Sequence, residues 1–256
     1  MSLVLGYANQ TDVSTLSGGT WNASYPLSNL KTRYLYQKTR SSNALAASTV
    51  INIDLGLEQT IGVVALVGHN LTGDAATVRI QGASNSGMSP TLYDSTAETV
   101  YSATDYAKHF TAINARYWRI SISDTGNTAG YVELSRLFIG WRFMPTVTND
   151  FGETLELESQ TVVQQALAGP EYFDERPNRR IWRGQLSWLS NTEAYRMLLV
   201  MLRQQDVSRE VYLIADDSDT NFRDQRNFLG RMRSLSSIEY PYPLRNSAAL
   251  EVAEVL

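Results

Sequence analysis

The sequence of 256 residues contains no cysteine, and histidine occurs only twice, at positions 69 and 109. Disulfide bonds and thiolate chemistry are therefore excluded, and a metal ion would need oxygen ligands or these two histidines. No apolar run approaches the ~18 to 20 residues that span a bilayer, and no basic leader precedes the short apolar run near the start. We expect a protein without membrane insertion, made in a cytoplasm.

The motifs of common enzyme classes are missing as well. No Gly-x-Ser-x-Gly elbow, phosphate-binding loop or dinucleotide fingerprint occurs. Asp217, Asp219 and Asn221 have the spacing of calcium ligands, but Phe222 stands where an EF-hand loop needs glycine. His69 follows an apolar run, where an imidazole commonly bonds to loop backbone; a ligand-contacting role is the alternative. We expect no enzyme, with no catalytic residue, cofactor or metal site.

Lysine is scarce, and its three occurrences all fall before residue 143. Residues 1–143 carry a net charge of +1, whereas residues 144–256 carry −5 and every basic residue there is arginine. Arginine is favoured in protein interfaces, although codon bias in a GC-rich genome would give the same pattern. The shift indicates a boundary near residues 143–150 and a second half that contacts proteins. A net-acidic chain with one basic, aromatic stretch at 31–40 predicts no sequence-specific nucleic acid binding.

The first half has the alternation of β-strands. Ile51 and Ile53 alternate with polar residues, and residues 61–67 are almost continuously apolar, which is typical of a strand covered on both faces. Trp118 and Ile120 begin a second alternating run, with arginine and serine between the apolar positions. Turn-rich stretches separate these runs. Residues 1–143 are therefore predicted to form one β-sandwich.

The second half reads as strands around a single helix. Ser190 and Glu193 form a capping box, which predicts a helix over residues 190–205. Residues 197–202 are all apolar, so the helix is covered nearly all round, by a second layer of its own domain or by another chain. We favour a subunit interface. Its expected residues are Arg196, Met197, Val200, Met201 and Arg203.

Three phrases in the first half carry a family resemblance. They are Ile-Asp-Leu-Gly at 53–56, Val-Gly-His-Asn-Leu at 67–71 and Ala-Arg-Tyr-Trp-Arg-Ile at 115–120. The set resembles the core strands of discoidin-like (galactose-binding-like) β-sandwich domains, which implies a recognition or packing module rather than a catalyst.

The second half resembles a different family. Arg-Ile-Trp-Arg-Gly at 180–184, Val-Tyr-Leu-Ile-Ala-Asp at 211–216, Phe-Leu-Gly-Arg at 228–231 and Ile-Glu-Tyr-Pro-Tyr-Pro at 238–243 are similar to the ring domains of tailed-bacteriophage tail-tip proteins. Distal tail (Dit-like) and tube-type domains of this kind are split β-barrels with one α-helix that close into rings. The resemblance thus implies a mainly β chain with a sandwich at 1–143 and a ring-type barrel at 144–256. Distal tail proteins usually have the reverse order of domains.

The two resemblances together imply a virion structural protein of a phage tail tip or baseplate, assembled in the bacterial cytoplasm. Its partners would be further copies of itself in a ring, with a hexamer as one option, and other tail proteins such as tube, hub and fibres. The alternative is a carbohydrate-binding module that recognises a host-surface glycan. Trp21 and the loop at 84–90 would then form its site, although a packed Trp21 that anchors the loop is the competing interpretation.

Overall fold

The computed structural model describes residues 2–101, 104–165, 169–219 and 221–256. The protein is mainly β, as the sequence predicts. The strands are β1 (Val4–Tyr7), β2 (Thr15–Ser17), β3 (Thr39–Arg40), β4 (Val50–Val67), β5 (Thr77–Ala83), β6 (Thr91–Thr99), β7 (Asp105–Ser123), β8 (Glu133–Leu134), β9 (Arg136–Phe143), β10 (Thr154–Glu158), β11 (Val162–Gln165), β12 (Glu171–Asp174), β13 (Arg179–Leu189), β14 (Glu210–Ile214), β15 (Phe228–Met232), β16 (Glu239–Tyr242) and β17 (Arg245–Glu254). The helical segments are two short 3₁₀ turns (Thr11–Val13 and Leu27–Lys31), a π-helical segment (Thr192–Leu198), α1 (Leu199–Gln205) and α2 (Arg223–Arg226). In the described part of the chain, no helix has the length and apolar character needed to cross a membrane.

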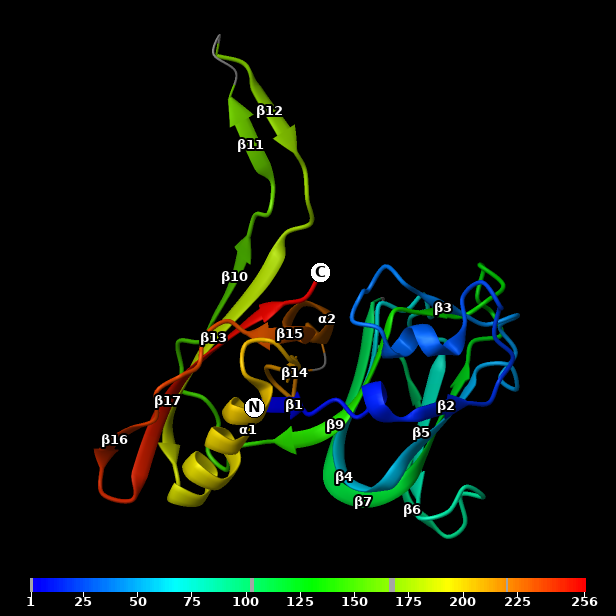
Figure 1. Cartoon of the computed structure of the whole chain (residues 1–256), viewed down its shortest axis with the longest axis horizontal. Coiled ribbons are helices and arrows are strands. Elements are labelled where there is room, and N and C mark those ends of the chain that lie inside the picture. Colours follow the sequence, from blue (N-terminus) through cyan, green and yellow to red (C-terminus); the bar gives the residue numbers. More distant parts are fainter. Residues whose placement is uncertain (1, 102–103, 166–168, 220) are drawn as a thin grey trace.

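The sandwich forms because two long strands fold over themselves. β4 and β7 pair antiparallel along most of their length, and both bend at mid-strand (Figure 1). In β4 the bend includes Gly56, whose left-handed φ of +77° favours glycine. One half of the pair is extended by β2, β5 and β6, and the other half by β9. Apolar side chains of both layers, among them Trp118 and Ile120, meet in one buried core, as their alternation predicts.

The second half forms a sheet of six antiparallel strands in the order β10-β13-β17-β15-β14-β1, with β16 on one end of β17. Its end strands, β10 and β1, do not pair with each other in the described residues, so the sheet stays open. The helix packs on one face: Leu198, Met201 and Leu202 share a core with Phe228 and Leu250. This arrangement is the β-rich unit with one helix that the sequence predicts.

The first strand lies in the sheet of the second half. β1 pairs with β14 on one side and with β9 on the other, and Leu3 and Leu5 are buried in the core that the helix covers. The sandwich is thus inserted after the first strand of the other unit. Below, "sandwich lobe" means residues 9–140, and "ring lobe" means residues 2–8 and 141–256.

The two lobes share a buried interface. Val63 and Phe138 of the sandwich lobe pack against Tyr212, Ile214 and Leu229 of the ring lobe. The run at 61–67 is therefore covered on both faces, by the opposite sandwich layer on one side and by the ring lobe on the other. The prediction of a doubly covered strand is confirmed, and its second cover is the other lobe.

The capping box also forms as predicted. The Glu193 amide donates to Ser190 Oγ at 3.2 Å, and Glu193 Oε2 accepts from the Ser190 amide at 2.8 Å. Glu193 Oε1 accepts a further bond from the Thr146 amide at 2.7 Å. Burial alone would raise the pKa of Glu193, but these bonds outweigh it and lower the pKa to about 2. The carboxylate therefore starts the helix and fixes the connector between the lobes.

Candidate assembly surface

Large apolar side chains are unevenly distributed over the surface. Among the described residues, 19 exposed ones lie in residues 144–256 and 7 in residues 1–143, although the second segment is the shorter. Single exposed apolar residues are normal on a protein surface, whereas a concentration of them marks an interaction site. The ring lobe is therefore the candidate assembly surface.

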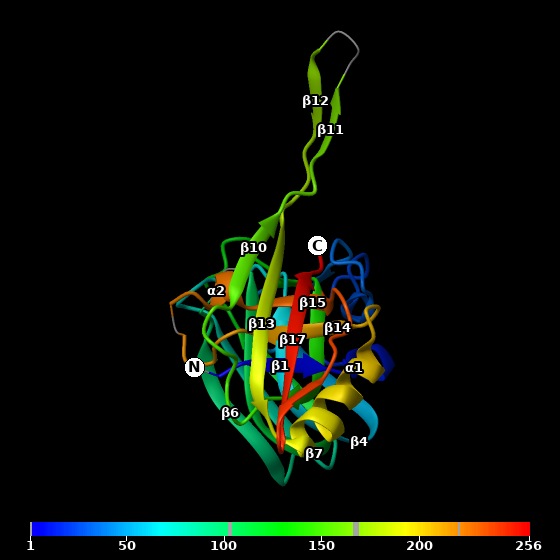
Figure 2. The ribbon, with the colours of Figure 1, turned by 90° about the vertical axis from the view of Figure 1, so that its left-hand side faces the viewer.

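The most exposed element of the ring lobe is a long hairpin, here called the arm (residues 154–183). Its base is the pairing of β10 with β13, and its outer part, β11 with β12, projects beyond the body of the molecule (Figures 1 and 2). Within the described part of the chain, β11 and β12 pair with each other and with no further strand, and every residue of both strands is exposed. An isolated two-stranded hairpin is only marginally stable in water. The outer arm is therefore a candidate surface for contact with another chain.

Both faces of the outer arm carry apolar side chains. Val163 lies directly opposite Phe173, so these two side chains share one face. Val162 and Tyr172 point to the other face, because side chains alternate along a strand. The Phe173 side chain is 59% exposed, with no buried core within the arm to receive it. Contact with another chain would remove this apolar area from water.

The helix divides into an inner and an outer face. Met201 is fully buried in the core of this chain, so it is not available to a partner, and Met197 packs half-buried at the edge of the same core. Arg196, Val200 and Arg203 are exposed on the outer side. Of the five expected interface residues, these three remain accessible. Val200 is 46% exposed and contributes the apolar part of that face.

A third exposed group lies at the end of the sheet away from the arm. Trp188 near the end of β13, Tyr240 and Tyr242 in β16, and Leu244 in the following turn are all exposed. Among the described residues β16 pairs with β17 alone, and it contains Pro241, which has no amide hydrogen to donate to a further strand. Aromatic side chains of this kind are enriched in protein interfaces.

Trp21 is held in place by its own lobe. It packs half-buried against the sandwich core, and its indole Nε1 donates to the Gly18 carbonyl at 2.9 Å. Its loop lies beyond the Val50 end of β4, because the Thr20 amide bonds to the Ser48 carbonyl. The loop at 84–90 follows Ala83, which pairs with Tyr117 at the other end of the strands. The two expected segments therefore do not meet in one glycan site.

His69 is a buried residue at the sandwich edge. Its Nδ1 accepts a hydrogen bond from the Leu71 amide at 3.2 Å, and its own amide donates to the Thr104 carbonyl. Burial lowers the pKa of the imidazole to about 4, so the ring is neutral at pH 7. With only 6% of the residue exposed, His69 orders the loop backbone and offers no surface to a ligand.

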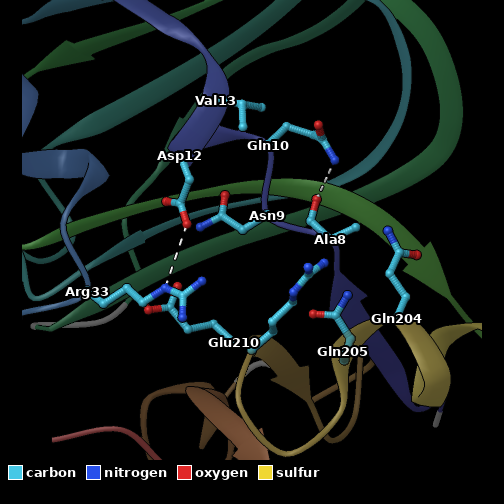
Figure 3. Close-up of a pocket in the computed structure, with 10 residues that line it drawn as sticks. Ala8, Asn9, Gln10, Asp12, Val13, Arg33, Gln204, Gln205 and Glu210 are labelled. Carbon is cyan, nitrogen blue, oxygen red and sulfur yellow. Dashed lines mark hydrogen bonds and ion pairs between the residues drawn. The ribbon is translucent and has the colours of Figure 1, made fainter.

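A polar pocket of 280 Å³ lies between the lobes (Figure 3). Asp12 and Arg33 form an ion pair on one wall, with Arg33 Nε 3.8 Å from Asp12 Oδ2. Gln204 and Gln205 lie on the opposite wall. Behind it, the fully buried guanidinium of Arg136 binds Glu210 at 2.7 Å and Asp12 at 2.6 Å. Both carboxylates are thus engaged in one ion-pair network that joins the lobes, which is a structural arrangement and not that of an acid–base pair.

The acidic loop at 216–221 is engaged internally, except that residue 220 lies outside the described residues. Arg226 Nη1 lies 3.1 Å from Asp219 and 3.6 Å from Asp216, and His109 Nε2 lies 3.7 Å from Asp217. Within the described ranges, no three acidic or histidine side chains converge on a point that could hold a metal ion. Arginine occupies the place that a cation would take.

Sequence reasoning missed the arm. The chain runs through β10 and on into a hairpin that returns along β12 and β13, whereas the sequence predicted only that the second half consists of strands around one helix. Two short segments of strand-forming residues, Val162 with Val163 and Tyr172 with Phe173, are the signal that could have revealed it. Their distance from any core could not be read from the pattern.

Comparison with known proteins finds similarity at the level of structure only. No family model matches the chain, and no curated protein matches it. Similar solved structures include the family 32 carbohydrate-binding module of C. perfringens NanJ in complex with galactose, with 16% identity over 53% of this chain and 98% of that module. The lectin domain of lectinolysin complexed with Lewis B antigen matches at 15% identity over 52% of this chain and 95% of that domain.

A crystal structure of SpGH29 matches at 15% identity, and this chain spans 28% of its length. The TM-score is 0.41 in all three comparisons. At this TM-score and identity, the three matches support no conclusion about this chain.

Proposed function

We propose that this protein is a structural subunit of a phage tail tip or baseplate that assembles with further copies of itself through the ring lobe. The observation that supports the proposal is the arm, whose outer strands pair with no other strand of the described residues and expose Val163 and Phe173 on one face. A segment of this kind is expected to be ordered against a partner chain.

The arrangement of exposed groups favours a head-to-tail contact. The arm, the outer face of the helix and the β16 turn are three separate surfaces of one lobe, so the arm of one copy can contact a different surface of the next copy. A contact between two different surfaces repeats from copy to copy and closes into a ring when the rotation allows. The sandwich lobe would then project as a brace for fibres or neighbouring tail proteins, in the virion.

The proposal is tested by charging the arm. Phe173→Glu together with Val163→Glu places two carboxylates on the exposed face and touches no core of the monomer. We expect the wild type to have a solution mass that is a multiple of 28.6 kDa and the variant to shift towards the monomer. Leu57→Glu is the matched control, because Leu57 is equally apolar and 72% exposed but belongs to the sandwich lobe. Equal masses for all three proteins would contradict the proposal.

Glycan binding by the sandwich lobe is the second candidate function. Trp21 and Tyr25 lie in one loop, and both rings are partly exposed, so they could stack on a sugar. Against this role, the face of Tyr25 is covered by the Arg40 guanidinium at 4.4 Å, and Trp21 is packed on the core. A bacterial-surface glycan array decides: saturable binding that Trp21→Ala abolishes without unfolding the protein would establish glycan recognition.

A further inference from the structure

Two hollows meet where the lobes adjoin the chain's last residues. A hollow of 690 Å³ is lined by the loop at 32–36 of the sandwich lobe and by Arg231, Val255 and Leu256 of the ring lobe. A second hollow of 300 Å³ is lined by the same three ring-lobe residues together with Arg179, Arg233 and Glu254, whose carboxylate pairs with Arg180. We call these two adjoining hollows together the basic hollow, because arginines outnumber carboxylates in their lining.

Arg231 differs from the other arginines of the basic hollow. Arg33, Arg179 and Arg233 each have a carboxylate within 4.0 Å: Asp12, Glu158 and Glu251 respectively are among these partners. Among the described residues no carboxylate pairs with Arg231, and its Nε, like that of Arg179, is buried without a hydrogen-bond acceptor. A half-buried guanidinium in this state favours an anionic group from outside the chain.

The same hollow presents aromatic rings to the solvent. Tyr34 and Tyr36 are both exposed, with ring centroids 5.7 Å apart, and they stand on the wall that faces Arg231. A ligand that fits must therefore combine an apolar or aromatic surface with a negative charge. The hollow spans both lobes, so a bound segment would contact each of them.

The outer arm has this combination of groups. Glu171 and Phe173 are two residues apart in β12, so they share one face with Val163 of β11. All three side chains are exposed. Asp174 pairs with Arg176 at 2.5 Å, whereas no cation of the described residues pairs with Glu171. At about 3.3 Å per strand residue, Glu171 stands on the order of 25 Å from Arg179 at the arm's base.

We propose that the outer arm of one copy seats in the basic hollow of the next, with Phe173 against Tyr34 and Tyr36 and with Glu171 paired to Arg231. This inference rests on the proposed self-assembly and names the contact that makes it. The contact joins two different surfaces, and it would place the sandwich lobe of the receiving copy in the interface.

The test is a charge exchange followed by mass measurement and sedimentation. Arg231→Glu and Glu171→Arg should each weaken assembly roughly tenfold or more, because each puts like charges together. The double variant should recover most of the loss. Arg119→Glu, the same charge change on the sandwich lobe, is the control and should leave assembly unchanged. If the double variant lost as much assembly affinity as the two single variants together, Glu171 would not pair with Arg231 and the proposal would be wrong.

The absence of cysteine allows a second, independent measurement. Tyr36→Cys combined with Phe173→Cys should give a ladder of oxidised species longer than dimers, whereas each single variant should give dimers at most. No ladder from an assembled double variant would overturn the seating of the arm in the hollow. A wild-type protein that stays monomeric would instead overturn self-assembly itself, so the two failures are distinguishable.

Discussion

The sandwich lobe and the ring lobe both have well-buried cores, yet their surfaces differ. On the sandwich lobe, outward positions of the long strands carry paired charges, such as Arg116 with Asp54 at 2.7 Å and Lys108 with Glu98 at 2.6 Å. On the ring lobe, the arm and the outer helix face expose Phe173, Val200 and similar apolar side chains. Both lobes carry paired charges on their strands, so the difference lies in the larger exposed apolar area of the ring lobe, which other chains cover in the function proposed above.

The comparison does not divide the molecule into independent halves. β1 and β9 join the two sheets, and Val63 and Phe138 pack against the ring lobe. An assembly that holds the ring lobe would therefore hold the sandwich lobe at a fixed orientation. A brace needs such rigidity, whereas a flexible recognition module does not.

The largest effect should come from the two faces of the helix. Met201→Glu buries an unpaired charge in the ring-lobe core and should lower the free energy of unfolding by about 4 to 5 kcal/mol. Val200→Glu, one residue earlier on the outer face, should change it by no more than about 0.5 kcal/mol while weakening assembly. Urea unfolding at low protein concentration measures both. A similar loss for the two variants would contradict the division into faces.

Breaking the interlobe ion pair should have the next largest effect. Arg136→Met leaves the Glu210 carboxylate buried without its cation and should lower the free energy of unfolding by about 3 to 4 kcal/mol. Arg79→Met removes an exposed pair with Asp94 and should have a much smaller effect on stability, because water screens exposed charges. Because the lobes share one sheet, we expect a single unfolding transition. Two transitions, with only one displaced by Arg136→Met, would show that the lobes are independent.

Removing one tryptophan from each lobe should affect stability in one case and self-association in the other. Trp21→Ala removes a half-buried ring from the sandwich core and should lower the free energy of unfolding by about 2 to 3 kcal/mol. Trp188→Ala removes a ring that is 51% exposed on the ring lobe, so stability should change by about 0.5 kcal/mol or less while self-association weakens. Thermal melts and sedimentation measure the two effects. If Trp21→Ala instead weakened self-association and Trp188→Ala instead lowered stability, the assembly surface would lie on the sandwich lobe, contrary to the proposal.

The smallest effect concerns the pH dependence of the sandwich lobe. Burial of the His69 imidazole lowers its folded-state pKa to about 4 from the ordinary 6.5. The neutral, buried imidazole therefore makes its full contribution to stability above pH 6.5. As the pH falls from 6.5 towards 4, the unfolded chain binds a proton that the folded chain does not, and by pH 5 the loss should be about 1 to 2 kcal/mol. His69→Gln, which keeps an acceptor for the Leu71 amide, should flatten this part of the profile. An unchanged profile would contradict the buried neutral imidazole.

Local sequence patterns correctly predicted those elements that pack one side against a buried core. The alternation at Trp118 and Ile120, the doubly covered run at 61–67 and the capping box of Ser190 with Glu193 all appear as expected. Each of these signals depends on neighbours in the chain or on one buried face. Such information is present in a single sequence.

Long-range placements could not be read in the same way. The pairing of β1 with β14 joins residues about 210 positions apart, and nothing in Leu3 or Leu5 specifies that partner. The apolar run at 197–202 likewise showed that the helix is covered widely, but not that Met201 faces inward and Val200 outward. The face of a helix is fixed by the sheet on which it packs.

The most direct test of the central claim is the mass of the wild-type protein in solution, measured by light scattering across micromolar concentrations. We predict a mass that is a multiple of 28.6 kDa and that falls on dilution, since association depends on concentration. The arm variant with Val163→Glu and Phe173→Glu should shift towards monomer at every concentration. A wild type that remains at 28.6 kDa throughout the range would contradict the conclusion that the ring lobe assembles.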